Sequence, residues 1–337
     1  MLELSAERAR LLDFARGSVH PEGGFGWLRV DGSLDLSRRR ELWINTRMTY
    51  VFARAGETEL VEHGLAALRE DFRDPEHGGW FSVAGEPGDK KAYEHVFVVL
   101  AAAAAGDADL LAEALEVLET RFWEERFGAL ADVCSRDWSA VEPYRGANAN
   151  MHGVEAMVAT GDPLWVERAS RITERFVGGV RVIEHYDPSW RPLPHYNRDD
   201  PAHPFRPYGS TPGHGFEWAR LAHGLGFEAE AQRLFAGAVH DGWDGSGFLY
   251  TVDFDGRPVV RARLHWVLCE AIAAAAVLGE REFERAWWEL AEQHFIDREG
   301  GSWWHELDTD NRPASTIWDG KPDVYHALTA VTQALPS

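Results

Sequence analysis

The chain contains 337 residues, of which 45% are hydrophobic and 26% charged, and its 34 basic and 55 acidic side chains give a net charge of −21. This charge repels the phosphates of nucleic acids and of anionic membranes, so we expect neither as a partner. The sequence contains no run of about 18 apolar residues, the length of a membrane span. Its N-terminal segment MLELSAERARLLDFARG is patterned as a charged amphipathic helix rather than as a signal peptide. These features predict a cytoplasmic protein.

Cysteine and aromatic content give two further expectations. Cys134 and Cys269 are the only cysteines, too few for a disulfide framework or a thiolate metal site, although they leave a single bridge open. The 15 Trp and 17 Phe exceed what an ordinary core of this size needs, and aromatic platforms are common where proteins hold sugars. Aromatic side chains that fill the core of a large helical domain account for the same composition more simply. Composition therefore points to a carbohydrate ligand without establishing one.

A glycine close to aromatic or apolar residues recurs along the chain. The repeats are Gly23–Trp27, Gly78–Phe81, Phe127–Leu130, Gly178–Val180, Gly247–Tyr250 and Gly300–Trp304. Their spacing of roughly 50 to 70 residues is the length of a helical hairpin with its connection. The sequence therefore predicts six helical hairpins.

Between these glycine turns the apolar residues follow helical spacing, as in 44–52, 97–105, 151–158 and 267–277. Strand-like alternation is confined to short pieces beside the glycines, such as 248–253. No flexible linker divides the chain, and the Pro-rich span 188–212 has the composition of a long functional loop. We expect one all-α domain over residues 1–337, with short β-hairpins in the connections.

Each predicted hairpin places polar or ionisable residues in an otherwise apolar helix. They are Arg47; Lys91 with His95; Asn148 with His152 and Glu155; His214 with Glu217; Trp266 with Glu270; and His326. Residues at i, i+3, i+4 and i+7 share one helix face, so each group forms a stripe. An open solenoid would place binding residues on an exterior concave face. If the hairpins instead close into an (α/α)6 barrel, the stripes converge on a deep polar pocket, and we favour this arrangement.

Taken singly, these residues are weak signals. The pattern His-x-x-Glu occurs at His152/Glu155 and at His214/Glu217, but a metal site needs further ligands, and the spacing His-Glu-x-x-His is absent. We therefore expect no metal. A carboxylate beside an imidazole has a clear acid–base role, because it fixes the ring and holds its pKa where protons exchange at neutral pH.

Four segments in a fixed order carry a family resemblance. They are Asn45–Tyr50, Asn148–Ala156, Pro212–Trp218 and Lys321–His326. Together they resemble the N-acylglucosamine 2-epimerase superfamily, and within it the aldose–ketose isomerases of the mannose isomerase and sulfoquinovose isomerase type. The similarity extends from about residue 20 to about residue 330. The chain is shorter than many members, so the loops that shape the pocket mouth are expected to differ.

The resemblance implies an (α/α)6 barrel that interconverts an aldose and a ketose through a cis-enediol or enediolate, without metal or cofactor. D-mannose and D-fructose are the first candidates for this pair of sugars. It implies that His214 and His326 transfer protons and that Glu217 orients or assists His214. The residues it assigns to holding the open-chain sugar are Arg47, Asn148, His152, Trp266 and Glu270, and from the polar stripes we add His95 and Glu155 to the substrate-binding set.

Several alternatives remain open at this point. A 2-epimerase shares the proton removal at C2 and differs in where the proton returns. A sulfoquinovose isomerase needs extra cations, for which Arg191, Arg198 and Arg206 are candidates, although surface positions are expected for them. A glycosidase would use two carboxylates from the set Glu155, Glu217 and Glu270. A noncatalytic sugar-binding scaffold would not need buried imidazoles, so convergence of His214 and His326 on one pocket separates it from an enzyme. The sequence does not indicate an oligomeric state.

Overall fold

The computed structural model describes residues 2–335, which form two concentric sets of helices. The outer helices are α1 (Leu4–Arg16), α3 (Thr58–Glu70), α5 (Ala108–Val117), α7 (Pro163–Phe176), α9 (Glu228–Gly242) and α11 (Arg281–Leu290). The inner helices are α2 (Leu42–Ala55), α4 (Ala92–Ala105), α6 (Ala147–Ala159), α8 (Pro212–Gly224), α10 (His265–Leu278) and α12 (Tyr325–Ala334). Two π-helical segments, η1 (Leu118–Phe122) and η2 (Ala291–Phe295), extend α5 and α11.

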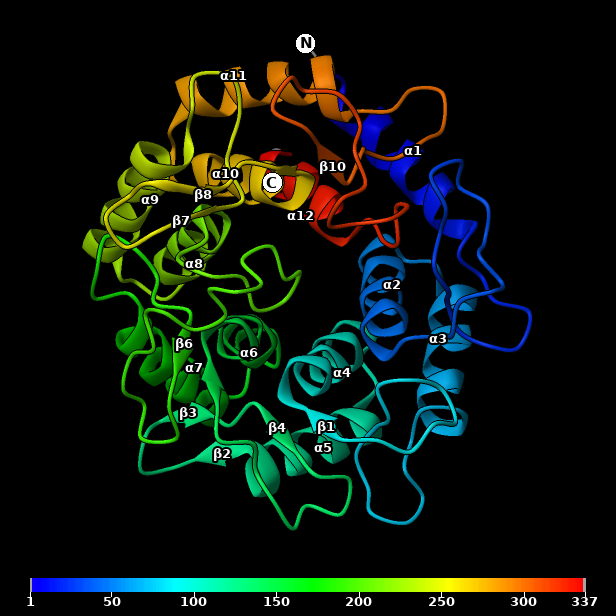
Figure 1. The fold of residues 1–337 in the computed structure, drawn as a ribbon. Helices are drawn as coiled ribbons and strands as arrows, with labels where there is room; N and C mark the ends of the chain where they lie inside the picture. The colour runs from blue at the N-terminus through cyan, green and yellow to red at the C-terminus, as the bar shows by residue number, and fades with distance from the viewer. Residues whose placement is uncertain (1, 336–337) are drawn as a thin grey trace.

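The inner helices form a closed ring. Successive inner helices pack against one another from α2 to α12, and α12 returns to contact α2 (Figure 1). Each outer helix packs against an inner neighbour, with α1 against α12. The predicted (α/α)6 barrel is therefore confirmed, and the open solenoid is excluded for the described residues.

The two sets of helices differ in sequence as their positions require. Inner helices contact neighbours on several sides, so α4 and α10 are apolar nearly all round, and their alanine runs allow close approach. Outer helices such as α7 and α11 have one apolar face and one charged face. Gly56, Gly106 and Gly279 end three inner helices in the left-handed region, with φ of 78°, 69° and 75°. A residue without Cβ adopts this φ readily, and the chain reverses within two residues.

The long connections all run from an outer helix to the next inner helix, at the end of the ring where the inner helices begin. All six predicted glycine turns lie in them or at their edges. Five short antiparallel strand pairs stabilise these connections. They are β1 (Lys90–Lys91) with β4 (Val133–Cys134), β2 (Trp123–Glu124) with β3 (Ala129–Leu130), β5 (Arg145–Gly146) with β6 (His185–Tyr186), β7 (Thr251–Val252) with β8 (Pro258–Val260), and β9 (Arg263–Leu264) with β10 (Glu306–Leu307).

Short β-hairpins occur in the connections, as the sequence predicts. Of the five strand pairs, β2–β3 and β7–β8 are hairpins within one connection. The other three pairs join one connection to the next around the ring, because neighbouring connections lie side by side at the same end of the barrel. They tie together the loops that surround the mouth of the barrel.

Two other expectations can be compared with the coordinates. Cys134 and Cys269 are both buried and unbridged. Within residues 2–335 no helix combines the length and apolarity needed to cross a bilayer.

Candidate active site

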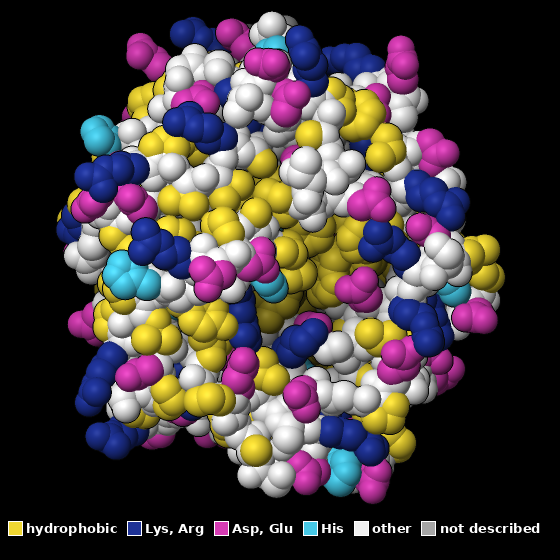
Figure 2. Space-filling view, in the orientation of Figure 1, with side chains coloured by type: hydrophobic (Ala, Val, Ile, Leu, Met, Phe, Trp, Pro, Cys, Tyr) yellow, Lys and Arg dark blue, Asp and Glu magenta, His cyan; other side chains and the backbone are white. Residues whose placement is uncertain are grey.

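A pocket lies at the end of the ring where the inner helices begin. It holds about 550 Å³ of empty space, open mouth included, and Figure 2 shows a hollow in this face with hydrophobic side chains on its walls and charged side chains around its rim. All six inner helices contribute to its lining. The lining residues are Trp43, Arg47, Tyr93, Asn148, His152, Pro204, Phe205, His214, Glu217, His265, Trp266, His305, Trp318, Pro322, Asp323 and His326.

Two of the lining histidines are held in the same way. The Nδ1 atom of His214 lies 2.8 Å from Oε2 of Glu184, and the Nδ1 atom of His326 lies 2.8 Å from Oε1 of Glu270. A carboxylate accepts the Nδ1 proton, which leaves the lone pair of the neutral ring on Nε2. Neither Nε2 atom has a hydrogen-bond partner within residues 2–335. Each ring therefore presents a free base to the pocket.

The two rings lie around one space. The Trp266 ring centroid is 5.3 Å from that of His214 and 5.9 Å from that of His326, so both imidazoles flank the same indole. Gly213, which precedes His214, makes this possible, because a Cβ at that position would collide with the Trp266 ring. The structure thus brings two residues that are 112 positions apart in the sequence to one pocket, both beside the Trp266 ring.

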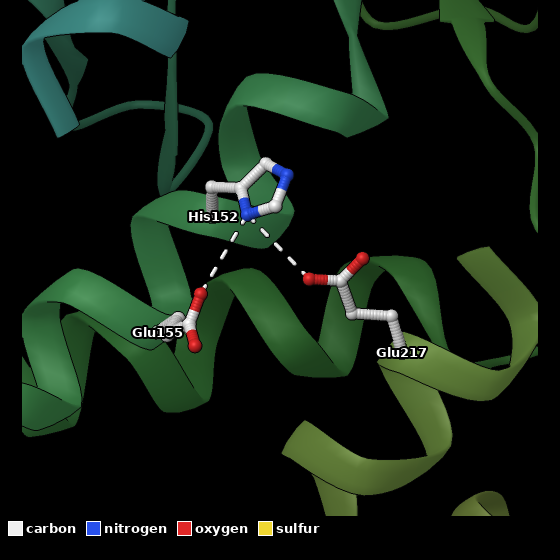
Figure 3. Close-up of side chains that lie close together, drawn as sticks. All are labelled: His152, Glu155 and Glu217. Carbon is white, nitrogen blue, oxygen red and sulfur yellow. Dashed lines mark ion pairs between the residues drawn. The ribbon is translucent and has the colours of Figure 1, made fainter. Parts of the chain in front are cut away.

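Glu217 lies elsewhere than the sequence predicts. Its Oε1 atom is 3.5 Å from Nδ1 of His152, on the other side of which lies Glu155 Oε2 at 3.6 Å (Figure 3). The predicted partner, His214, is instead bound by Glu184. Although His214 and Glu217 share a face of α8, the ring turns toward the loop that precedes the helix, whereas the Glu217 carboxylate extends across to α6. Glu217 therefore does not orient His214.

Burial sets the protonation of this group. It lowers the pKa of His152 to about 4, although nearby Glu155 acts in the opposite direction, so the imidazole is neutral. Burial, followed by the charge of Glu270, raises the pKa of Glu217 well above its ordinary value and favours the neutral carboxyl. Neither oxygen of Glu217 has a hydrogen-bond partner among the described residues. A neutral acid thus faces the pocket next to a neutral imidazole.

Three carboxyl groups, among them the Glu217 carboxyl whose pKa is raised, surround one guanidinium beneath the pocket. Arg220 lies 3.1 Å from Glu270, 3.6 Å from Glu217 and 3.9 Å from Glu155. Glu270 therefore binds Arg220 and His326, and Glu155 accepts a hydrogen bond from the Tyr325 hydroxyl. Neither Glu155 nor Glu270 lines the pocket, so the predicted direct contact of these two with the sugar is not what the geometry provides. They position other groups.

This cluster also contains the residues nearest to a metal-binding arrangement. Candidate ligand atoms of His152, Glu155 and Glu217 lie within 4.8 Å of one another, and so do those of Glu217, Glu270 and His326. Arg220 contacts all three carboxylates, and a fixed cation at this position opposes the entry of a divalent ion. The donor set is better suited to holding a guanidinium and two imidazoles.

Arg47 supplies a permanent positive charge to the pocket wall. It donates to the Tyr93 hydroxyl at 2.7 Å and to Asp323 at 3.3 Å, and its guanidinium lies over the rings of Phe97 and Tyr325 at 4.6 and 4.8 Å. Burial acts to lower the pKa of Arg47, but Tyr93 and Asp323 outweigh it and raise the pKa above its ordinary value. The side chain is therefore charged and fixed.

His95 is the one predicted site residue that lies away from the pocket and its supporting cluster. Its Nδ1 donates to the Lys91 carbonyl at 2.7 Å, and its Nε2 accepts from the Trp80 backbone at 3.1 Å. Both nitrogens are thus used by the backbone, and the ring packs between aromatic side chains. His95 anchors the connection before α4, which is the ordinary structural role of a buried histidine.

Several lining residues were not singled out from the sequence. They are Trp43, Tyr93, Phe205, His265, His305, Trp318 and Asp323, together with Glu184 and Arg220 behind them. Asp323 lies within the segment Lys321–His326 that carries the family resemblance, and His265 directly precedes Trp266. The sequence could therefore have indicated both as site residues. Glu184 directly follows the apolar pair Val182-Ile183, a weak sign of a buried carboxylate. Only three of the 15 Trp reach the pocket, because most pad the core.

The three arginines considered for a sulfonate lie outside this pocket. Arg191 and Arg198 are exposed, and Arg206 is paired with Glu142 and Asp132. Among the described residues Arg47 is the only Lys or Arg that lines the pocket.

Comparisons with known proteins identify the family of the chain. Residues 23–330 match the family described as N-acylglucosamine 2-epimerase. A D-mannose isomerase from Thermobifida fusca is 46% identical, with 97% of this chain and 92% of that protein covered. A solved structure of a D-mannose isomerase superposes with a TM-score of 0.91 at 29% identity, covering 98% of this chain and 96% of that one.

A more distant structure shares the architecture. A cellobiose 2-epimerase from Spirochaeta thermophila DSM 6192 superposes with a TM-score of 0.85 at 22% identity, covering 98% of this chain and 94% of that one. The chain therefore belongs to the N-acylglucosamine 2-epimerase family and is a sugar isomerase.

Proposed function

We propose that this enzyme interconverts D-mannose and D-fructose through a cis-enediol or enediolate, with His214 and His326 as the proton-transferring pair. The observation that carries the proposal is the matched pair of imidazoles, each bound to a carboxylate at Nδ1 and free at Nε2, on one pocket. The D-mannose isomerases at 46% identity and at a TM-score of 0.91 support the choice of substrate.

The reaction needs two proton transfers at carbon. The Nε2 of one histidine takes the proton from C2 of the open-chain aldose, and the C–H electron pair forms the C1–C2 double bond while the aldehyde oxygen gains the negative charge. The other histidine, which enters this step as the imidazolium, delivers a proton to C1 while the hydroxyl proton on O2 passes to O1, and this gives the ketose. The first histidine keeps the proton taken from C2, so the pair exchanges its protonation states in each turnover. Imidazole suits both steps, because both of its forms are accessible near neutral pH.

The developing enediolate needs hydrogen-bond donors or positive charge already in place. Arg47 and neutral His152 line the pocket, and the N-terminal ends of the six inner helices, which carry partial positive charge, surround it. Preorganised donors of this kind are worth about 3 kcal/mol each in other enzymes. We assign enediolate stabilisation to Arg47 and His152 on this basis.

The remaining lining residues fit the role of holding the sugar. Asn148 offers both a donor and an acceptor to hydroxyl groups, and Trp266 offers an apolar face between the two histidines. Glu217 stays in the proposal as a neutral acid beside His152. The residues used come from all six helical pairs or their connections, so we take the whole ring as one catalytic domain.

We propose that the reaction is independent of metal. Arg220 already neutralises the carboxylates from which the two candidate ligand sets are drawn, and the acid–base pair needs no Lewis acid.

Sulfoquinovose fits the pocket less well than mannose, because a sulfonate needs a free cation. Arg47, the one cation that lines the pocket in the described chain, is already bound by Asp323. Epimerisation would share the removal of the C2 proton with isomerisation, but the proton would return to C2 instead of C1.

The test is product analysis after chelator treatment. Purified enzyme is incubated separately with mannose, glucose, fructose and sulfoquinovose, and products are identified by NMR. We expect mannose and fructose to interconvert fastest, with activity unchanged by chelator. Conversion of mannose to glucose without fructose, or faster turnover of sulfoquinovose, would contradict the proposed reaction or substrate. Loss of activity with the chelator, restored by a divalent metal, would contradict metal independence.

A further inference from the structure

Phe205 occupies an unusual position at the mouth of the barrel. It belongs to the connection between β6 and α8, a loop that extends from its own side of the ring toward the centre (Figure 1). Its ring centroid lies 6.2 Å from Trp43, 5.6 Å from Tyr93 and 5.7 Å from Trp318. Trp43 and Tyr93 begin helices α2 and α4, so the loop reaches across the mouth to touch the opposite side.

A second and larger cavity adjoins the active-site pocket. It holds about 1620 Å³ of empty space, open mouth included, against about 550 Å³ for the pocket. Trp43, Tyr93, Asn148 and Phe205 line both. These four residues therefore form the wall between the two spaces, and Phe205 is the one contributed by a loop rather than by an inner helix.

The loop that carries Phe205 is fixed on both sides of the ring. The next residue, Arg206, makes two hydrogen bonds to Glu142, of 3.0 and 2.8 Å, and its guanidinium lies 4.0 Å from the centroid of the Tyr144 ring. On the other side the Tyr250 hydroxyl lies within hydrogen-bond distance of the carbonyls of His203 and Pro204, at 3.0 and 3.2 Å. Anchored in this way, the phenyl ring is a fixed part of the wall.

The chemistry of the second cavity fits a sugar unit. Its lining includes the carboxylates of Glu41, Asp89 and Glu94, which accept hydrogen bonds from hydroxyl groups, and the aromatic rings of Trp43 and Tyr144, on which sugar faces pack. It shares with the active-site pocket the side chains of Trp43, Tyr93, Asn148 and Phe205. A reducing disaccharide held at His214 and His326 would need to pass that wall to place its second unit there.

We propose that Phe205 is the residue that limits this enzyme to monosaccharides. Its ring closes the pocket behind a single hexose, and removing the ring joins the pocket to a cavity able to take the second unit of a reducing disaccharide. The proposal rests on the sugar isomerase activity proposed above. It adds that Phe205 restricts the length of the sugar that the enzyme accepts. It concerns the side chain alone, since the backbone contacts of residues 203–206 do not depend on the ring.

The test compares Phe205→Ala with wild type and with Phe205→Tyr, which keeps a ring at the wall. The substrates are D-mannose and reducing disaccharides in which a second hexose is joined at O4 or O6 of mannose, and kcat/KM is measured from ketose formation by NMR. For Phe205→Ala we expect the ratio of disaccharide to mannose kcat/KM to rise at least tenfold for one linkage. For Phe205→Tyr we expect the wild-type ratio. An unchanged ratio in a folded Phe205→Ala variant would overturn the proposal, as would wild-type turnover of a disaccharide at the rate of mannose.

The same variants separate this proposal from the proposed activity. If wild-type enzyme fails to isomerise mannose, the proposed function fails on that result alone. Calorimetric binding of mannose and of the disaccharides to wild type and Phe205→Ala still tests the wall, with at least tenfold tighter disaccharide binding expected for the variant and equal binding overturning it. If Phe205→Ala does not fold, Phe205→Leu takes its place, because it keeps an apolar side chain but removes the far edge of the ring.

Discussion

The Nδ1 atom of His214 lies 2.8 Å from Oε2 of Glu184, and the same distance separates Nδ1 of His326 from Oε1 of Glu270. One pair is formed by a loop and α8, the other by α10 and α12. A carboxylate in this position fixes the ring and its tautomer and stabilises the imidazolium when it forms. The two histidines therefore share this carboxylate contact, but burial followed by the charge of Arg47 lowers the pKa of His326 well below its ordinary value, and Glu270 is also bound by Arg220.

Replacing Glu184 by Gln keeps the size of the side chain but removes the charge that His214 faces. We expect kcat for mannose to fall about a hundredfold while KM changes less than about threefold, because the residue acts through His214 rather than on the sugar. The kinetics are to be measured across pH, since a change in the basicity of His214 displaces the profile.

A matched control is available on the surface. Glu228 contacts His223 at 2.7 Å with both side chains partly or largely exposed, so Glu228→Gln removes a similar pair away from the pocket. Its kinetics should equal those of wild type. A Glu184→Gln enzyme with kcat within twofold of wild type would remove Glu184 from the mechanism.

Truncation of the histidines tests their roles directly. For His214→Ala and for His326→Ala we expect kcat to fall by about 10³-fold or more, because each variant lacks one of the two proton-transferring groups. Mannose should still bind, as measured by calorimetry, since the lining residues Arg47, Asn148 and Trp266 remain. His223→Ala serves as control. Nearly full turnover by either variant would show that the assignment is wrong.

Substitution of His95 tests whether this residue anchors the connection before α4, as the structure indicates, or binds the sugar, as the sequence predicts. Because both of its ring nitrogens bind backbone groups outside the pocket, His95→Gln should keep kcat within about twofold of wild type while lowering the melting temperature. A large loss of kcat in a folded variant would return His95 to the sugar site.

The same variant should change the pH dependence of stability. Burial lowers the pKa of His95 to about 3, whereas an imidazole in the unfolded chain titrates near 6.5. Between these values the unfolded state binds more protons, so His95 lowers the free energy of unfolding as pH falls, by up to about 1.4 kcal/mol per pH unit. Urea unfolding between pH 4 and 6.5 should therefore show a shallower slope for His95→Gln than for wild type. The exposed His195→Gln provides the control.

For Glu217 we predict a pH dependence of the free energy of unfolding that is opposite in sign to that of His95. Its carboxyl pKa is raised in the native state by burial and by the charge of Glu270, so above the ordinary value of 4.5 the native state holds a proton that the unfolded state releases. That contribution to stability is complete below pH 4.5 and is lost as pH rises through the raised pKa. Because Glu217→Gln does not titrate, its unfolding free energy relative to wild type should increase from pH 5 to pH 8. A constant difference would show that Glu217 is ionised in the native protein.

The sequence predicted the ring better than the contacts within it. Regular glycine turns and apolar helical stripes indicate six hairpins, and polar stripes such as Asn148 with His152 indicate a common axis, because helical periodicity fixes which side chains share a face. The partner of His214 was beyond this reasoning. Glu217 lies on the same helix face, yet the ring binds Glu184, which a loop 30 residues earlier brings to it.

The position of His95 outside the pocket has a similar cause. Like Arg47 and His214, it lies within the first two turns of an inner helix, so the sequence pattern groups it with them. Whether a histidine faces the pocket or the backbone of the preceding connection depends on the path of that connection, here residues 71–89, which short-range patterns do not determine. Phe205 was missed for the same reason, since only the folded loop brings it to α2 and α4.

The central claim is that two histidines move protons between C2 and C1, and isotope labelling tests it most directly. Mannose is converted by the enzyme in deuterated water, and the fructose formed is examined by NMR before extensive back-reaction. Because the proton leaving C2 and the proton reaching C1 belong to different imidazoles that exchange with solvent, we predict one deuteron at C1 of each fructose molecule. Fructose that carries two protons at C1, with the original C2 hydrogen transferred intact, would contradict the account.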